Sequence, residues 1–306
     1  MQKIIVIGGS RYFGRLLVER LHAAGHRVTV VNRGSTPPPE GVEHLVVDRN
    51  DEAALRAALD GRGFDVVVDQ VCYTPVQAAI AARAFAGRTR RYVMTSTIEV
   101  YDPATAALPA APAGTPVPES AVDPAVWRVA EDLPWQDPAY LEEHYAEGKR
   151  QAEAVLAAAG GFEFASVRSA HVLGGGALEF TGRLAHYTGR VTRGEEITVH
   201  ARPRPTVFIH HEELAEVLLW AAAADFTGPV NACSDGPLDV HGLLDAIAAQ
   251  TGREPVLRTV PAGSDASPFS FDRHYAMDNS RAAELGFRFS RTADWLPGAV
   301  AEALTA

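Results

Sequence analysis

The chain has 306 residues, of which 47% are hydrophobic and 22% charged, a composition typical of one large globular domain or of a large domain joined to a smaller one. Its formal net charge of −10 argues against the basic surface of a general nucleic-acid binder. The two cysteines, Cys72 and Cys233, stand far apart and in no metal-ligand spacing, which argues against a zinc site and against a disulfide framework.

The start of the chain and its apolar runs bear on localisation. The first predicted strand is not preceded by a charged segment with a long apolar run, so we expect no secretory signal. We also expect no membrane-spanning helix, because no run of about 18 apolar residues occurs. Together with the sparse cysteines, these features predict a cytoplasmic protein that has no membrane partner.

Strands and helices alternate over the first hundred residues. The expected strands are 3–7, 27–32, 44–47, 65–69 and 92–95, and the expected helices are 15–24, 51–59 and 75–86. The first strand is continuously apolar, as in strands buried on both faces of a sheet. The alternation predicts an α/β fold with a doubly wound parallel sheet and right-handed crossovers.

The pattern changes after the fifth strand. Residues 102–138 are rich in proline and alanine but carry Trp127 and Trp135, so we expect an ordered insertion of the kind that often forms a lid. Beyond it we expect helices at 138–159, 211–224, 240–251, 280–285 and 292–303, and strands at 163–167, 206–209, 229–231 and 256–259.

A glycine-rich turn, GGSRYFG at residues 8–14, joins the first strand to the first helix. Backbone N–H groups in such a turn face a pyrophosphate at the helix N-terminus. Gly8 permits the tight turn and Gly14 a close packing of helix on sheet, whereas Arg11 replaces the middle glycine of the usual pattern. The turn predicts a Rossmann dinucleotide-binding core over residues 1–170, and a smaller, interleaved α/β substrate-binding part over 171–306.

The end of the second strand bears on the choice of cofactor. An acid that grips the ribose of NAD is expected there, but the chain has Asn32 followed by Arg33. With Arg11 nearby, two guanidinium groups favour NADP, while NAD stays possible. Asp48 is placed either to meet the adenine amino group or to cap its own loop. The positions expected to line the cofactor are Gly8, Ser10, Arg11, Tyr12, Phe13, Gly14, Asn32, Arg33, Asp48, Arg49, Val71 and Lys149.

Tyr145 and Lys149 are four residues apart on a predicted helix and therefore share a face. A phenol with a pKa of about 10 is a poor base at neutral pH, and a neighbouring ammonium lowers that pKa toward a useful range. Lys149 can also hold the nicotinamide ribose. Thr97, at the end of the fifth strand, can bond the same substrate oxygen. The three residues predict acid/base chemistry coupled to hydride transfer.

The glycine turn, the strand end TSTIEVY (residues 95–101) and the YAEGK helix (145–149) together resemble the extended short-chain dehydrogenase/reductase superfamily, NAD(P)-dependent epimerase/dehydratase group. The segment FIHHEELA (208–215) resembles that group's F-V-H-V-x-D-V-A element, with Glu213 in place of the Asp. The pattern GGxRxxG resembles an atypical subgroup, some of whose members lack the Tyr–Lys pair kept here.

The resemblance also bears on Glu99. Related dehydratases read T-D-E-V-Y and related decarboxylases T-S-E-V-Y, and both use the glutamate in proton transfer. Here Glu99 is kept, but Ile98 stands at the dehydratase aspartate, which argues against standard 4,6-dehydration. Glu99 is therefore either a second proton-transfer group or a salt-bridged or solvated side chain.

The substrate side is less defined. Arg168 follows the sixth strand, Arg202 and Arg204 could clamp an anionic group or be surface charge, and His210 could line the substrate or be structural. We expect no metal site. The family analogy implies a small, sugar-like or sugar-nucleotide substrate.

Three functions follow from these residues. The first is an NADP(H)-dependent oxidoreductase acting on a secondary alcohol or ketone. The second is an epimerase, decarboxylase or dehydratase that keeps and recycles its cofactor. The third is non-catalytic, because plant stem-loop RNA-binding proteins resemble the same subgroup, although the acidic charge and the Tyr–Lys pair argue against it. Alanines at helical spacing in 75–86 and 139–159, together with the resemblance, imply a homodimer.

Overall fold

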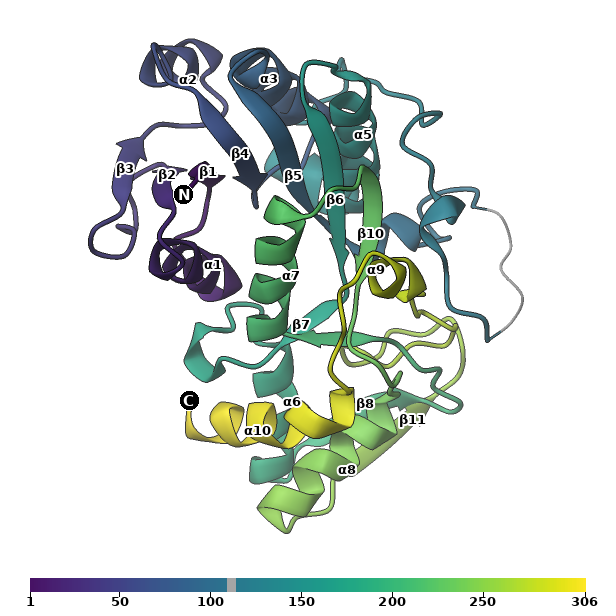
Figure 1. The fold of residues 1–306 in the computed structure, drawn as a ribbon. Coiled ribbons are helices and arrows are strands. Elements are labelled where there is room, and N and C mark those ends of the chain that lie inside the picture. Colours follow the sequence, from purple (N-terminus) through teal and green to yellow (C-terminus); the bar gives the residue numbers. More distant parts are fainter. Residues whose placement is uncertain (109–113) are drawn as a thin grey trace. The chain divides into compact units, whose positions relative to one another are not determined.

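The computed structural model describes residues 1–108 and 114–306 (Figure 1), and the chain divides into two compact units. Of the described residues, the first unit comprises 1–108, 119–169 and 215–231, and the second comprises 114–118, 170–214 and 232–306. The chain therefore leaves and re-enters the first unit twice. Each unit is described by itself below.

A seven-stranded sheet, in the order β10-β6-β5-β4-β1-β2-β3, forms the centre of the first unit. Its strands are β1 (Lys3–Ile7), β2 (Arg27–Asn32), β3 (Glu43–Val46), β4 (Phe64–Asp69), β5 (Thr89–Thr97), β6 (Glu163–Ser169) and β10 (Gly228–Ala232). Strands β1 to β6 pair in parallel, and Ile7 is in register with both Val31 and Asp69. The turns that follow β1, β2 and β4 therefore leave the sheet at one edge.

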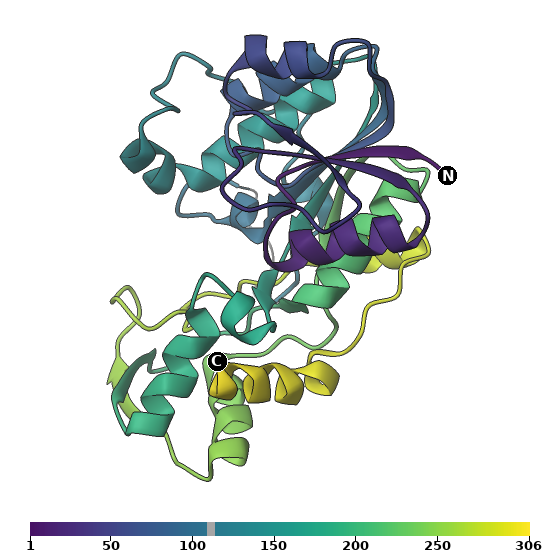
Figure 2. The same cartoon turned by 90° about the vertical axis from the view of Figure 1, so that its left-hand side faces the viewer.

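Helices cover both faces of this sheet. Helix α1 (Tyr12–Ala23) and the part of α7 (His211–Ala223) that belongs to this unit lie on one face, while α2 (Glu52–Ala58), α3 (Pro75–Phe85) and α5 (Tyr145–Ala158) lie on the other (Figures 1 and 2). Alanines along α3 and α5 let these two helices pack closely together. The strands of the sheet, which lie between the two helix layers, are rich in Val and Ile, whose branched side chains suit a sheet buried on both faces.

The second unit is a smaller α/β assembly. It contains two parallel strand pairs, β7 (His171–Leu173) with β9 (Phe208–His210) and β8 (Glu196–His200) with β11 (Val256–Val260). Helices α6 (Arg183–Arg193), α8 (Val240–Thr251) and α10 (Thr292–Thr305) pack on one another around an aliphatic and aromatic core, and α9 (Ser280–Glu284) is short. This unit also has a 3-10 turn, η3 (Gly176–Leu178). Two further 3-10 turns, η1 (Ile98–Tyr101) and η2 (Glu119–Ala121), belong to the first unit.

The structure departs from the sequence expectation in two places. The helix expected over 138–159 is two helices, α4 (Pro138–Glu143) and α5, which break at His144 where φ is −109° and ψ 23°. The break is confined to this residue, because the backbone N–H of His144 still donates to Tyr140 and that of Gly148 to His144. The elements β7, α6 and β8 were not predicted. For α6, the N-cap residue Gly182 has no side-chain oxygen, and the Glu179 carboxylate bonds the first amides of the helix instead.

Helix length and polarity bear on membrane insertion. Among the residues that the structure describes, no helix combines the length and the apolar character needed to cross a membrane.

Candidate functional site

The glycine turn between β1 and α1 has a backbone that side chains would disrupt. Gly8 and Gly9 adopt φ angles of 96° and 72°, in the left-handed region that favours glycine. A methyl group on Gly9 would lie 2.8 Å from Val6, and one on Gly14 would collide with the side-chain oxygen of Gln70. The turn is therefore close-packed on the sheet through its glycines.

The same turn fits a dinucleotide pyrophosphate. Arg11 occupies the N-cap of α1 but gives the helix no side-chain hydrogen bond, and the backbone N–H groups at a helix N-terminus are the groups that bind a phosphate. Gln70, which follows β4 and lies against Gly14, has a buried Nε2 with no hydrogen-bond partner. Tyr12 is a buried non-glycine residue at φ 50°, a strained conformation of the kind found at functional sites.

Asn32, at the end of β2, connects two loops and a strand. Its Nδ2 donates to Ser10 Oγ at 2.6 Å and to the carbonyl oxygen of Thr36 at 3.1 Å. Its Oδ1 accepts from the backbone N–H of Gly34 at 2.6 Å and lies 2.9 Å from Nε2 of His44. The side chain therefore bonds the glycine turn, its own loop and β3 simultaneously.

Arg11 directly follows Ser10, and Arg33 directly follows Asn32, the two residues joined by the 2.6 Å hydrogen bond. Both arginines are exposed, and neither forms an ion pair within residues 1–108 and 114–306. Ile7 and Val31 are in register on neighbouring strands, and Ser10 is hydrogen-bonded to Asn32. The side chains of Arg11 and Arg33 therefore start from neighbouring backbone positions at the carboxyl edge of the sheet.

Three further expected cofactor residues lie nearby in different settings. Asp48 is exposed, and its Oδ1 accepts from the backbone N–H of Asn50, which is the loop-capping arrangement. Arg49 is buried, and its Nη1 donates to both carboxylate oxygens of Asp69 at 2.7 Å, so its charge is already paired. Val71 packs against the glycine turn, 3.2 Å from the place of a Gly8 methyl group.

Lys149 is a buried cation with spare hydrogen-bonding capacity. It is 2% exposed, and its Nζ donates to the carbonyl oxygen of Thr95 at 2.9 Å. Its Nζ also lies 4.6 Å from the ring centre of Tyr73 and 5.9 Å from that of Tyr145. Burial lowers the pKa of Lys149 to about 8. The helix spacing thus brings Tyr145 and Lys149 to one place, beside the end of β5.

The end of β5 carries the other two expected catalytic residues. Thr97 is the last residue of the strand, and its Oγ1 accepts from the backbone N–H of Glu99, which caps η1. Both Thr97 and Glu99 are half-buried, whereas Ile98 is 2% exposed. Thr95, which binds Lys149, lies two residues before Thr97 on the same strand, so the strand end and the Tyr–Lys helix converge.

Tyr73 and Gly148 belong to this site and were missed by sequence reasoning. A methyl group on Gly148 would collide with the carbonyl oxygen of Tyr73 and would lie 3.2 Å from the Trp135 ring. Gly148 therefore lets two other segments approach α5 between Tyr145 and Lys149. A glycine inside a predicted helix, between two candidate catalytic residues, was the available signal, because such a glycine often marks close packing.

The insertion 102–138 is fastened to α5 where it is described; residues 109–113 of the expected lid lie outside the described residues. Trp127 Nε1 donates to Glu147 at 3.1 Å, and the backbone N–H of Ala130 donates to Gln151 at 2.8 Å. This part of the insertion therefore covers the face of α5 that carries Glu147 and Gln151.

Arg150 fixes the start of the insertion to the same helix. Its Nε donates to the carbonyl oxygen of Val100, and its Nη2 to the carbonyl oxygen of Asp102 and the hydroxyl of Thr105. Its Nη1 pairs with Glu147 at 3.0 Å. The side chain of Arg150 is fully buried by these contacts.

This packing affects the expected dimer surface. Within the single chain, the only exposed residue of α3 is Arg83, and the exposed residues of α5 are Ala157 and Ala158. A four-helix interface needs an exposed face on both helices. An interface on α3 and α5 would therefore also have to use half-buried positions such as Val76, Ala82 and Val155.

Arg168, expected to bind substrate, is instead part of a buried network. Its Nε and Nη2 bond the carboxylate of Glu153, with the shortest contact at 2.6 Å. Its remaining N–H groups donate to the Tyr101 hydroxyl and to the carbonyl oxygens of Glu119 and Val122. Because Arg168 and Glu153 are both fully buried and mutually paired, the geometry gives Arg168 a structural role.

The remaining substrate candidates lie in the second unit. Arg202 and Arg204 are exposed, and the backbone N–H of Arg204 donates to the carbonyl oxygen of Phe271. His210 is half-buried, with its ring 5.3 Å from that of Trp295. The described residues contain no group of three His, Cys, Asp or Glu side chains that could hold a metal ion.

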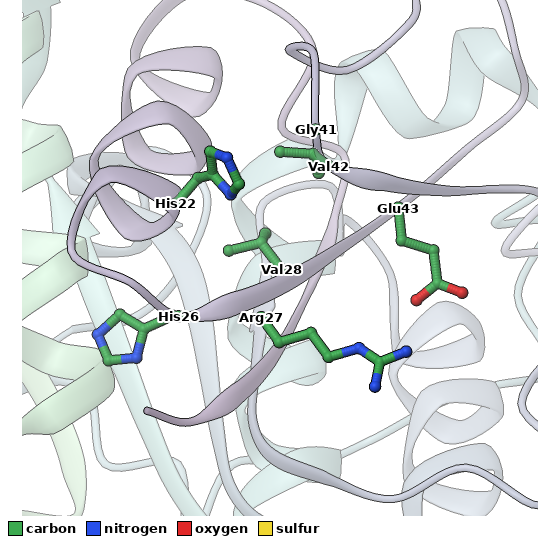
Figure 3. A pocket seen from close by; sticks show the side chains of 7 residues that line it. All are labelled: His22, His26, Arg27, Val28, Gly41, Val42 and Glu43. Carbon is green, nitrogen blue, oxygen red and sulfur yellow. The ribbon is translucent and has the colours of Figure 1, made fainter.

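A separate pocket lies at the opposite edge of the sheet (Figure 3). It is lined by His22, His26, Arg27, Val28, Gly41, Val42 and Glu43. Arg27 begins β2 and Glu43 begins β3, so this pocket is at the amino edge of the strands. Nucleotides bind such sheets at the carboxyl edge, where Asn32 ends β2, so this pocket is not the candidate cofactor site.

The comparisons with known proteins agree with this geometry. A family model described as the NAD dependent epimerase/dehydratase family matches residues 4–233. The 2′-dehydrokanamycin reductase of Streptomyces kanamyceticus is 31% identical over 137 residues, which cover 44% of this chain and 39% of the reductase. The chloroplast stem-loop binding protein of 41 kDa b of Arabidopsis thaliana is 35% identical over 83 residues, 22% of each chain. The chain thus spans less than half the length of these curated relatives.

Solved structures of similar fold cover the whole chain. The Bordetella bronchiseptica enzyme WbmH in complex with NAD+ superposes with a TM-score of 0.72 at 20% identity, over 100% of this chain and 98% of that one. The UDP-glucose 4-epimerase of Thermus thermophilus in complex with NAD gives 0.72 at 20% identity, over 99% of each. At this identity the likeness establishes the fold, an α/β Rossmann-type sheet with a smaller C-terminal part.

Proposed function

Because the chain belongs to the NAD-dependent epimerase/dehydratase family of enzymes, we propose that it is an NADP(H)-dependent oxidoreductase acting on a secondary alcohol or ketone. The observation that carries this proposal is the buried Lys149, which binds the end of β5 and lies beside the Tyr145 ring. We also infer from GGxRxxG that the chain belongs to the family's atypical subgroup.

In this proposal Tyr145 exchanges a proton with the substrate oxygen. The pKa of Lys149 is about 8, so its side chain is mostly charged at neutral pH and favours the phenolate form of Tyr145. Because its Nζ donates one hydrogen bond, to Thr95, it has further N–H groups for the cofactor ribose. Thr97 orients the same substrate oxygen from the end of β5. A nicotinamide cofactor held beside Tyr145 and Lys149 would supply or accept the hydride. Glu99, half-buried next to Thr97, is an additional proton-transfer group.

An NAD(P) nucleotide is the family's cofactor, and we propose that this chain prefers NADP. Arg11 and Arg33 are exposed at adjacent points on the sheet edge and have no ion pair in the described part of the chain. Asn32 stands where a carboxylate would repel a 2′-phosphate, so that phosphate would meet two guanidinium groups and no opposing charge.

The substrate we propose is small, polar and sugar-like. The curated relative from Streptomyces kanamyceticus is by its name a reductase of a dehydro-sugar antibiotic, which supports testing keto-sugars first. Two structural relatives were solved with UDP-sugars, which supports testing nucleotide sugars second. The homodimer and cytoplasmic location expected from the sequence stay proposals.

The leading alternative is an epimerase or decarboxylase that keeps its cofactor bound. The similarity in fold to UDP-glucose 4-epimerase favours it, and Glu99 would then move a proton next to a transient ketone. The similarity to a stem-loop binding protein covers only 22% of the chain, so RNA binding is the weaker rival.

One experiment separates these functions. The purified protein is incubated with keto-sugars and nucleotide sugars, with and without added NADPH, and absorbance at the reduced-nicotinamide band is followed with product analysis. The proposed reductase consumes NADPH in proportion to product. Turnover without added cofactor would support the recycling alternative, and RNA binding with no turnover would support the third.

A further inference from the structure

We propose that Asn32 is a positioning residue for cofactor choice: it holds together the two loops that carry Arg11 and Arg33 and does not itself bind the cofactor. This inference rests on the NADP preference proposed above. It assigns that preference to a network of Asn32 with four neighbours, Ser10, Gly34, Thr36 and His44, which we call the Asn32 hub.

Two backbone groups fix the orientation of the Asn32 amide. The N–H of Gly34 can only donate, so the side-chain atom 2.6 Å away is the oxygen. The carbonyl of Thr36 can only accept, so the atom 3.1 Å away is the nitrogen. Reversing the amide would oppose donor to donor and acceptor to acceptor at both contacts, so the assignment follows from the backbone alone.

The contacts with His44 and Ser10 use the remaining hydrogen-bonding capacity of the Asn32 amide. Nε2 of His44 faces Oδ1, so the His44 proton is on Nε2 and is donated to Asn32. Ser10 Oγ accepts the second Nδ2 hydrogen. An amide has two donor hydrogens and two acceptor lone pairs, and Asn32 uses all four. A ribose hydroxyl could bind this side chain only by displacing one of these partners.

The hub determines where the arginines start. Arg11 directly follows Ser10, and Arg33 lies between Asn32 and Gly34, both of which belong to the hub. Gly34 has a φ of 85°, and a methyl group on it would lie 2.9 Å from Val46, so the loop after β2 follows one constrained path. Both backbone origins are therefore fixed by the same side chain.

Aspartate at position 32 would undo this arrangement through hydrogen bonding and charge. A carboxylate keeps the two acceptor contacts, to Gly34 and His44, but has no hydrogen for the Thr36 carbonyl, which it would repel. It also adds a negative charge beside Arg11 and Arg33. Alanine removes the hub without adding charge. Substitutions of His44 are milder. His44→Leu removes one hydrogen-bond donor at a half-buried strand position, whereas His44→Gln puts another donor in its place.

The experiment measures the affinity ratio of adenosine 2′,5′-bisphosphate to 5′-AMP by calorimetry, and of NADPH to NADH by fluorescence. The variants are Asn32→Asp, Asn32→Ala, His44→Leu and His44→Gln, with an Arg11→Ala/Arg33→Ala double variant as the reference for lost preference. Thermal unfolding of each variant shows whether it is folded. All four hub variants retain both arginines.

We expect the wild type to favour the 2′-phosphate ligands by roughly tenfold or more, the scale of a charge-assisted contact. Asn32→Asp should lose this preference fully, Asn32→Ala largely and His44→Leu partly, while His44→Gln should retain it. The 5′-AMP affinity should change far less, which a general loss of structure would not reproduce.

Two results would overturn the inference in distinguishable ways. If the double arginine variant loses the preference but the folded Asn32 and His44 variants keep it, the NADP proposal stands and the hub has no role in it. If the wild type shows no preference, or favours NADH, both the cofactor proposal and the hub fail. His44→Leu decides the matter if the Asn32 variants do not fold.

Discussion

Two regions of the first unit each hold a pair of arginines, and they use them in opposite ways. Around α5 and β6, Arg150 and Arg168 are fully buried, and every N–H group of both side chains has a protein acceptor. At the carboxyl edge of β1 and β2, Arg11 and Arg33 are exposed and form no ion pair in the described part of the chain. Arg150 and Arg168 hold segments of the first unit together, whereas the charges of Arg11 and Arg33 are available to bind an anion.

From this difference we propose that unused hydrogen-bonding capacity distinguishes residues expected to bind a ligand better than charge or burial does. Lys149 illustrates this, because it is as buried as Arg168 but donates one of its three hydrogens to the protein, at Thr95. Asn32 illustrates the reverse, because it lies half-buried at the proposed binding edge with its capacity fully used. The experiments below test this distinction, starting with the largest expected effect.

Arg168→Ala should destabilise the fold more than any other change proposed here. It leaves the fully buried Glu153 carboxylate without its partner and removes the donors to Glu119 and Val122. Loss of one member of a buried ion pair costs about 3–5 kcal/mol. Urea unfolding followed by circular dichroism measures the change in the free energy of unfolding.

The matched control is Arg33→Ala at the exposed edge. It should change the free energy of unfolding by no more than about 0.5 kcal/mol, as is usual for surface positions. Similar losses for the two variants would contradict the comparison. A measurable effect of Arg168→Lys on stability, smaller than that of Ala, would further support the role of the guanidinium fork.

Tyr145→Phe should have the largest effect on turnover. It removes only the hydroxyl and keeps the ring beside Lys149 and Tyr73, so folding and NADPH affinity should be nearly unchanged. Turnover should fall at least about a hundredfold, the low end for general acid/base catalysis. Tyr73→Phe is the control, because it removes the other phenol at the site. If Tyr73→Phe is the more damaging of the two, Tyr145 is not the acid/base.

Arg33→Ala should act on the cofactor and spare the fold. We expect it to weaken NADPH binding more than NADH binding by about 1–3 kcal/mol, because it removes a charge-assisted contact to the 2′-phosphate. Fluorescence titration with both cofactors provides the measurement, and Arg15→Ala, which breaks a surface pair with Glu19, serves as a charge-matched control. An equal loss for both cofactors would count against a 2′-phosphate site at Arg33.

Much of the first unit could be predicted because its signals are local. The apolar strands, the glycine turn and the Tyr–Lys spacing are all set within a few residues, and the α/β sheet followed from their order. The helix break at His144 was missed because it is confined to one residue, and the helical hydrogen bonds continue on both sides of it. In the second unit, the N-cap of α6 is Gly182 and the first amides are bonded by Glu179, which precedes the N-cap, so the usual start signal was absent.

The roles of the site residues depended on contacts between distant positions. The sequence predicts a substrate ligand at Arg168, since nothing in its own strand shows that Glu153 and the carbonyl of Val122 surround it. Tyr73 was missed because its approach to Lys149 needs Gly148, which lies far along the chain on α5. Sequence identifies which residues can do chemistry, and packing decides which of them retain the capacity for it.

The pH dependence of Lys149 gives the smallest but most specific test. Burial holds its pKa near 8, below the ordinary value of 10.5, so it is charged below about pH 8 and loses its proton above that. NADPH affinity should change little near pH 7, fall about twofold by pH 8 and then weaken by about tenfold for each further pH unit, since the 2′-phosphate is already almost fully ionised at pH 7. Unfolded Lys149 binds its proton up to pH 10.5, so this residue's contribution to stability rises with pH over the window in which affinity falls. Lys149→Met should abolish both trends, which separates them from general alkaline unfolding, and an affinity profile in the wild type that stays flat to about pH 9.5 would show that the charge on Lys149 does not hold the cofactor.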